Sequence, residues 1–145
     1  LTVEKNNIES FKDAYWLFEN GTKNGTDSFK KIGTIALDVQ QKQVSEKVDK
    51  CFDIKLFEKD FKIINATENI SELGNAICNK YDMPSIMFFY TSLDTVVLSF
   101  RSLDHLTDVS AVAKKFAGGG HRNAAGCEVS SKILSNILNG VSHNI

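Results

Sequence analysis

The sequence predicts an α/β fold: a mixed β-sheet of about five strands flanked by helices and preceded by a helical connector. Three observations support this prediction. Apolar residues recur at helical spacing in the first third of the chain. From residue 54 onward, short β-prone runs alternate with helical segments, and two of these runs lie close enough in sequence to form a hairpin.

The first third is expected to form two helices. Residues 8–20 carry apolar side chains at helical spacing, and Gly21–Gly25 interrupts the pattern. Thr26 or Asp27 can cap a second helix that runs to about Cys51. The polar face of this second helix is rich in lysine and glutamine and could touch nucleic acid. A solvated face is favoured, because acidic residues interrupt it.

The sheet is expected to begin after the connector. Ile54–Phe57 and Phe61–Ala66 are short β-prone runs, and residues 58–60 are predicted to form the turn between them. Ser71 is predicted to cap a helix over residues 72–80, because a serine hydroxyl accepts from the first free amides of a helix.

The second half is expected to complete the sheet with a hairpin and a last strand, and to add two helices. Asp108 is a good N-cap for the first of these helices. Phe88, Phe89 and Tyr90 alternate across one strand, so at least one of them should lie in the core. The strands are predicted over 85–90, 95–100 and 124–129, and the helices over 109–116 and 132–141.

Composition limits the class of protein. The chain has 145 residues, 42% of them hydrophobic, and a net charge of −1. The near-neutral charge argues against a protein that coats nucleic acid, whose domain pI usually exceeds about 9. Cys51, Cys78 and Cys127 lie far apart without Cys-x-x-Cys spacing, so we expect free thiols in a reducing compartment. No apolar run reaches the length of a membrane span and no signal peptide is evident, so we expect a cytoplasmic protein without a membrane partner.

The most specific stretch of the sequence is Gly118-Gly119-Gly120-His121-Arg122-Asn123-Ala124-Ala125-Gly126. Glycine lets a ligand approach the main chain, and successive amides in a glycine turn can hold a phosphate. His121 would add a titratable hydrogen-bond donor, and Arg122 would add a permanently charged guanidinium group with several donors. Because the run follows the C-terminal end of a predicted helix, the helix dipole does not favour an anion there. The alternative is a glycine turn that only caps this helix.

Together with Ser99-Phe100-Arg101-Ser102, this stretch resembles the C-terminal substrate-binding domain of the DHH (Asp-His-His) phosphoesterase superfamily, in its exopolyphosphatase-related and oligoribonuclease-like branch. Members carry a Gly-Gly-Gly-His motif after a short helix and a Ser-x-Arg-Ser motif on an upstream strand. The resemblance is strong from about Ile54 to Val129. It implies that residues 1–52 are a helical connector from a missing N-terminal catalytic domain, and that residues 53–145 are the DHH-associated substrate-binding domain. A start at Leu1 rather than at methionine is expected of a processed or excised piece.

The resemblance also implies a function. The chain would be the substrate-binding half of a metal-dependent phosphoesterase or phosphodiesterase that acts on short oligonucleotides or nucleotides. Mn²⁺ or Mg²⁺ is expected in the missing N-terminal DHH domain and not in this chain, which contains no Asp-His-His string, only the weak look-alike Asp104-His105-Leu106. This chain alone is therefore expected to be inactive. Its implied partners are a short single-stranded nucleic acid or nucleotide and the N-terminal DHH domain of the same protein.

Carried over residue by residue, the resemblance assigns a site. His121 would be the catalytic residue, donating to the scissile or an adjacent phosphate, and Arg101 would grip a phosphate through a charge-assisted pair. Arg101 could instead pair with Asp104 or Asp108, and Asn123 could simply close its loop. The implied phosphate-binding set is Arg101, Ser99, Gly118, Gly119, Gly120, Arg122 and Asn123.

Two other functions compete with this one. The chain could be a stand-alone module that binds phosphate, nucleotides or nucleic acid without catalysis. An accessory domain of the alanyl-tRNA synthetase type is less favoured, because the glycine-rich motif there normally lacks the His-Arg-Asn-Ala-Ala continuation. The near-neutral charge favours short oligonucleotides over long polymers, since long strands usually engage extended basic grooves with stacking aromatics.

Overall fold

The computed structural model describes residues 23–140 of the chain, with side chains from residue 28 onward. The predicted helix over residues 8–20 lies outside the described residues. The chain divides into two compact units, one ending at Gln43 and the other beginning at Val44. Helix α2 (Lys23–Lys47) crosses this boundary and is followed by a 3₁₀ turn, η1 (Val48–Lys50). The predicted second helix is thus confirmed, but the break expected through Gly25 was wrong, since a helix tolerates an isolated glycine at a cost of about 1 kcal/mol.

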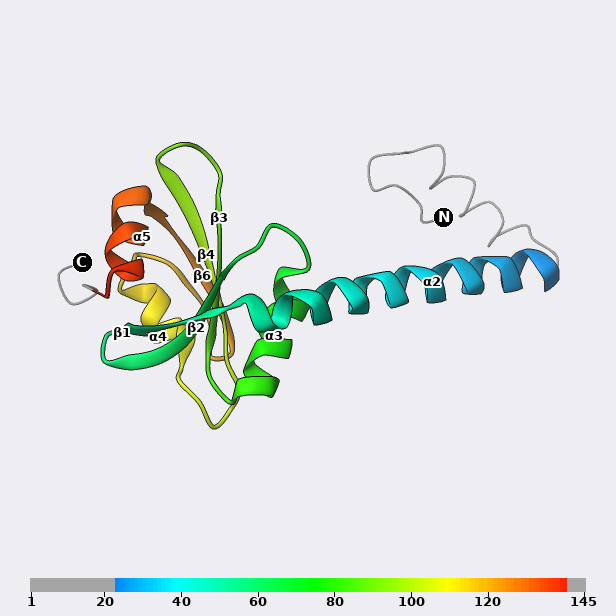
Figure 1. Ribbon diagram of the computed structural model, residues 1–145, viewed down its shortest axis with the longest axis horizontal. Coiled ribbons are helices and arrows are strands. Elements are labelled where there is room, and N and C mark those ends of the chain that lie inside the picture. The colour runs from blue at the N-terminus through cyan, green and yellow to red at the C-terminus, as the bar shows by residue number, and fades with distance from the viewer. Residues whose placement is uncertain (1–22, 141–145) are drawn as a thin grey trace. The chain divides into compact units, whose positions relative to one another are not determined.

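The second unit contains a mixed six-stranded sheet in the order β1-β2-β3-β4-β6-β5 (Figure 1). Neighbouring strands are antiparallel except β2 and β3, which are parallel and are joined through a helix, as a parallel pair requires. The predicted α/β class is confirmed. The strands are β1 (Phe52–Leu56), β2 (Lys59–Asn65), β3 (Ser85–Tyr90), β4 (Thr95–Arg101), β5 (Gly119–His121) and β6 (Ala124–Ser130).

Helices cover both faces of the sheet (Figure 1). Helix α3 (Ile70–Tyr81) packs on β3 and β4 from one side. Helices α4 (Val109–Lys114) and α5 (Ser131–Leu138) pack on the other side, α4 against β5 and β6 and α5 against β1 and β6. The N-cap role predicted for Asp108 is confirmed, because its carboxylate accepts from the Ser110 amide at 3.0 Å.

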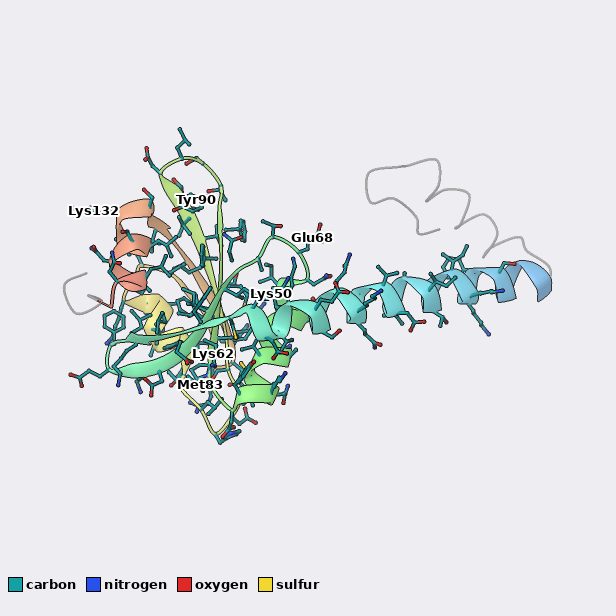
Figure 2. All side chains as sticks on the ribbon, viewed as in Figure 1. Lys50, Lys62, Glu68, Met83, Tyr90 and Lys132 are labelled. Carbon is teal, nitrogen blue, oxygen red and sulfur yellow. The ribbon has the colours of Figure 1, made fainter. Side chains whose placement is uncertain are left out.

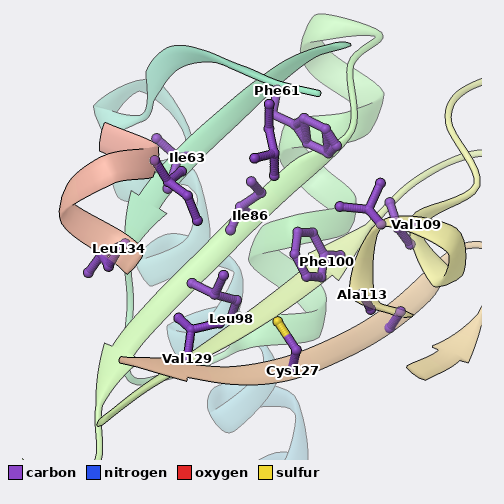
Figure 3. Close-up of a cluster of buried hydrophobic side chains, with 14 of the residues drawn as sticks. Phe61, Ile63, Ile86, Leu98, Phe100, Val109, Ala113, Cys127, Val129 and Leu134 are labelled. Carbon is purple, nitrogen blue, oxygen red and sulfur yellow. The ribbon is translucent and has the colours of Figure 1, made fainter. Parts of the chain in front are cut away.

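Each face of the sheet has its own hydrophobic core. The larger cluster lies under α4 and α5, and Figure 3 shows it between strands β2, β3, β4 and β6 and helix α4. Phe61 and Phe100 meet there edge to face, with ring centroids 6.3 Å apart. The smaller cluster lies under α3 and includes Leu73, Ile77 and Met87. Burial of both clusters fixes which residues of each strand remain on the surface.

The turn between β1 and β2 differs from the prediction. Phe57 and Glu58 form it, and both have positive φ, at 50° and 65°. Two residues with positive φ give the turn whose twist matches a tight hairpin. The sequence indicated residues 58–60, because neither Phe57 nor Glu58 is a residue type that usually adopts this conformation.

The start of α3 also differs from the prediction. Asn69 occupies the N-cap position in a left-handed conformation and makes no side-chain capping hydrogen bond. Ser71 therefore lies inside the first turn, and the cap predicted for it was wrong. Its hydroxyl instead accepts a hydrogen bond from Arg101 in the sheet.

The aromatic residues of β3 and the three cysteines differ in how deeply they are buried. Phe88 packs against the larger core, whereas Tyr90 is 51% exposed near the end of the β3–β4 hairpin (Figure 2). The cysteines are free thiols, as predicted, and Cys78 and Cys127 are buried. Among the described helices, none combines the length and apolar character that crossing a membrane requires.

Candidate functional site

Several predicted phosphate-binding residues share one face of β4, β6 and β5. Residues directly opposite each other in antiparallel strands lie on the same face. The pairing therefore creates two adjacent rows across these strands, which we call the open face: Arg101–Ala124–His121 and Ser99–Gly126–Gly119. Since neighbouring strands lie about 4.8 Å apart, the backbones at the two ends of a row are about 10 Å apart.

The middle of the open face has almost no side chains. Ala124 contributes a methyl group and Gly126 only a hydrogen. A Cβ added at Gly119 would meet no atom within 4 Å, so the space above this position is free within the described structure. Helices α4 and α5 lie on the opposite face of the sheet, whereas α3 packs on the same face as these rows, over β3 and β4, with Gly74 against Arg101. A small anion therefore has room between the side chains of Arg101 and His121.

Arg101 is half-buried at the end of β4 and is held by two hydrogen bonds. Its Nη2 donates to the Ser71 hydroxyl at 2.7 Å, and its Nη1 donates to the Phe100 carbonyl at 2.8 Å. A guanidinium group has five N–H donors, so three remain for a ligand. The alternative ion pairs with Asp104 or Asp108 are not formed. These carboxylates accept from Asn123 and Ser110 instead.

His121 is exposed at the end of the short edge strand β5. Within residues 23–140, its imidazole makes no hydrogen bond or ion pair. Both ring nitrogens are therefore available, one as a donor and one as an acceptor in the neutral form. This is an arrangement in which a ligand could engage the ring directly.

Only the last two glycines of the run lie in a strand, and the run does not form the phosphate-holding turn that was expected. Gly119 and Gly120 pair with β6, and the Gly118 amide donates to the Ala113 carbonyl at 2.9 Å. Amides of a strand alternate between its two edges and do not converge on one concavity. Because β5 is the last strand of the sheet among the described residues, its outer edge presents backbone groups that no described strand pairs with.

Arg122 holds the loop between β4 and α4. Its Nη2 donates to the carbonyls of Asp104 and Leu106, both at 2.8 Å, which uses both hydrogens of that nitrogen. Its own carbonyl accepts from the Val109 amide at 2.9 Å. The Nη2 group of Arg122 thus binds main-chain carbonyls of the neighbouring loop and not a ligand on the open face.

Asn123 contacts the same loop. Its side-chain Nδ2 donates to the Asp104 carboxylate at 2.6 Å, and its main-chain carbonyl accepts from the Ser102 amide at 3.0 Å. The remaining side-chain oxygen, Oδ1, is buried without a protein partner. Next to this contact, hydrogen bonds from Ser110 hold the pKa of the Asp108 carboxyl below its usual value. The loop-closing role considered for Asn123 therefore has direct geometric support.

The described residues offer no metal site. In residues 23–140, no group of three or more His, Cys, Asp or Glu side chains is arranged to hold a metal ion. The Asp104-His105 pair, which weakly resembles the Asp-His-His motif, already contacts other protein groups. His105 pairs with Asp82, and Asp104 accepts a hydrogen bond from Asn123. These residues do not fit a metal pair.

Comparison with known families identifies the class of protein. A family model described as the DHHA1 domain matches residues 53–144. The chain belongs to this family, the DHHA1 domain of the DHH phosphoesterase superfamily.

Two relatives match part of the sequence. The oligoribonuclease NrnB of Bacillus subtilis (strain 168) is 32% identical over 72 residues, which is 49% of this chain and 18% of that protein. The uncharacterized protein R106 of Acanthamoeba polyphaga mimivirus is 37% identical over 65 residues, 43% of this chain and 15% of that protein. The aligned region thus spans less than a fifth of either relative.

Solved structures share the fold. The pGpG-specific phosphodiesterase PggH of Vibrio cholerae gives a TM-score of 0.61 at 14% identity, over 98% of this chain and 52% of that one. A manganese-bound exonuclease RecJ gives 0.53 at 13% identity, over 92% and 35%. An uncharacterized protein of Helicobacter pylori G27 gives 0.52 at 21% identity, over 91% and 43%. At these identities the likeness concerns the fold alone.

Proposed function

We propose that this chain is the substrate-binding half of a metal-dependent phosphoesterase that acts on short oligonucleotides or nucleotides, and that its open face holds a substrate phosphate. The observation that carries the proposal is the row in which Arg101 and His121 flank Ala124 on one face of the sheet, next to the free space above Gly119. Membership of the DHHA1 family supports the class of reaction. The relatives named as an oligoribonuclease and as a pGpG-specific phosphodiesterase support a short nucleic acid as substrate.

In this proposal the phosphate lies over Ala124 and Gly126. Arg101 binds it through some of its three remaining N–H groups, in hydrogen bonds that are shorter and stronger than neutral ones because both partners are charged. Ser99 lies one row further along the same face and can donate its hydroxyl proton. The absence of side-chain atoms at Gly126 and Gly119 lets the phosphate approach the sheet closely.

His121 would act on the bond that is cleaved. It lies opposite Arg101 across the open face, and its ring nitrogens are uncommitted in the described structure. A histidine in this position can donate a hydrogen bond or a proton to a phosphate oxygen as charge develops there. The N-terminal DHH domain would supply Mn²⁺ or Mg²⁺ to activate water and neutralise charge.

Arg122 and Asn123 would position the site and not contact the substrate. Their hydrogen bonds to Asp104 and Leu106 fix the turn that directly follows His121. We assign them the role of holding β5, and with it His121, against the loop before α4. This assignment replaces the direct phosphate contact inferred from the family resemblance.

Binding measurements on the 145-residue chain test the proposal. The probe is a 5′-phosphorylated dinucleotide, compared by titration calorimetry with the same dinucleotide without its 5′-phosphate. Arg101→Ala should weaken binding of the phosphorylated probe by about tenfold or more, as expected for hydrogen bonds to a charged group. Lys132→Ala, a change of an exposed cation in α5, should leave the affinity unchanged.

Hydrolysis separates the enzyme from the stand-alone module. In the longest protein that carries this chain, assayed with Mn²⁺, His121→Ala should remove most turnover, while His105→Ala should not. Binding without hydrolysis in that protein would favour the non-catalytic module. Both probes carry the internal phosphodiester, so failure of the wild-type chain to bind either of them would show that the open face does not bind phosphate.

A further inference from the structure

Helix α3 contributes directly to the placement of Arg101. Ser71, in the first turn of α3, accepts the hydrogen bond from Nη2 at 2.7 Å. Ser71 makes no capping hydrogen bond, and within the described residues its hydroxyl proton has no acceptor. Among residues 23–140, the hydrogen-bond contact of this hydroxyl is therefore the guanidinium that the proposed function places on the substrate phosphate.

One helical turn further on, Gly74 makes room for the stem of Arg101. A Cβ at Gly74 would lie 2.6 Å from Cγ and 3.1 Å from Cβ of Arg101. These are atoms near the main chain, so they cannot move aside as easily as the end of a long side chain. The absence of a side chain at Gly74 thus allows the arginine to run between α3 and the sheet toward Ser71.

A buried hydrogen bond fixes α3 at this position on the sheet. The hydroxyl of Ser85 donates to the Gly74 carbonyl at 2.9 Å, and Ser85 is fully buried. Ser85 is also the residue directly opposite Arg101 in the β3–β4 pair. The helix is therefore held beside the strand position that carries the arginine.

We propose that Ser71 is a positioning residue for Arg101, a role that rests on the proposed function of the open face. A long arginine side chain samples many rotamers, and holding one of its nitrogens limits this freedom before the ligand arrives. The bond to Ser71 uses one of the two hydrogens on Nη2 and leaves the other hydrogen and Nε free. In this way α3 holds the guanidinium in the orientation that binds the phosphate, although α3 itself does not contact the phosphate.

A double-mutant cycle on the 145-residue chain tests this role, with the 5′-phosphorylated dinucleotide as probe. Ser71→Ala should weaken binding about fivefold, the size expected for one lost hydrogen bond to a charged group near the surface. Ser71→Thr keeps the hydroxyl and should restore most of the affinity. In the Arg101→Ala background, Ser71→Ala should have no further effect, because the group that it positions is gone.

Controls separate positioning from folding. Ser135→Ala changes an exposed helical serine of α5 and should change neither affinity nor the urea midpoint. Ser71→Ala should also leave the urea midpoint near that of the wild type, while the side-chain NMR signal of Arg101 Nε shifts even without ligand. An unchanged Nε signal together with unchanged affinity would overturn the proposal.

Two further results of the double-mutant cycle would contradict the positioning role or the proposed function. If Ser71→Ala weakened binding by the same factor in the Arg101→Ala background, Ser71 would contact the ligand itself, and the positioning role would be wrong. If Arg101→Ala had no effect on affinity, the proposed function of the open face would fail first.

Discussion

Gly118 and Gly119 are adjacent in the glycine run, but their surroundings differ. A Cβ at Gly118 would lie 2.2 Å from the Gly126 carbonyl oxygen, whereas a Cβ at Gly119 would meet nothing within 4 Å. Gly118→Ala should therefore lower the free energy of unfolding by about 1–3 kcal/mol through overpacking. Gly119→Ala should change it by less than about 0.5 kcal/mol.

Urea unfolding of the two alanine variants is the measurement. Equal destabilisation by both substitutions would contradict the packing described for Gly118. A loss of affinity for the phosphorylated dinucleotide in Gly119→Ala, without loss of stability, is expected, because the new methyl group would stand on the open face.

Cys127 provides a pH-dependent test of the larger core. Burial raises the pKa of its thiol to about 12, while an unfolded chain releases this proton near the ordinary thiol pKa of 9.0. The contribution of the protonated thiol to stability is fully present below pH 9 and is lost as the pH rises toward 12. Relative to Cys127→Ala, the wild type should thus lose stability between pH 8 and pH 10, measured by urea unfolding. A difference that stays constant over this range would contradict burial of the thiol.

At the scale of elements, the β5–β6 hairpin depends on its contact with the loop before α4. Asp104→Ala and Asn123→Ala each remove the 2.6 Å hydrogen bond between these residues. Each should weaken binding of the phosphorylated dinucleotide about threefold, because His121 and the edge strand lose a fixed position. The double variant should be no weaker than either single variant, since one interaction is lost in all three.

Asp94→Ala serves as the matched control for this hairpin test, because Asp94 is an exposed aspartate in the β3–β4 connection. Calorimetric affinities of the four variants are compared at one salt concentration. Additive losses in the double variant would mean that Asp104 and Asn123 act separately, for example by contacting the ligand.

Hydrophobic spacing was sufficient to predict most helices and strands, because the two core clusters require period 2 in the strands and helical period in α3 and α4. It could not predict β5, since Gly119 and Gly120 have no side chains to show a strand pattern. It also missed the role of Ser71. A serine before a helical run indicates a cap, and only the packing of α3 on β4 reveals Arg101 as its partner.

At the scale of the whole molecule, Arg101 and His121 are brought together by strand order. The motifs lie about 20 residues apart, and no local pattern indicates that β6 inserts between β4 and β5. The family resemblance pointed to both residues, but their shared face follows from the register alone. The same register explains why Arg122 and Asn123, in the turn beyond His121, face the neighbouring loop instead.

The small net charge of −1 predicts a weak dependence of binding on salt. Each neutralised phosphate of a single strand contributes a slope of about −0.7 to the plot of log affinity against log salt concentration. A site built around Arg101 should give a total slope between about −0.7 and −1.4, for a phosphorylated dinucleotide and for a long single strand alike. A much steeper slope for the long strand would indicate an extended binding surface and contradict a preference for short substrates.

The most direct test of the central claim is a map of amide chemical shifts in the 145-residue chain during titration with a 5′-phosphorylated dinucleotide. We predict shifts that centre on Ser99, Arg101, Gly119, His121 and Gly126, with α5 unchanged, and smaller shifts of the same amides with the dinucleotide that lacks the 5′-phosphate but keeps its phosphodiester. Shifts confined to α4 and α5, or no shifts at concentrations that saturate the calorimetric signal, would contradict a phosphate site on the open face.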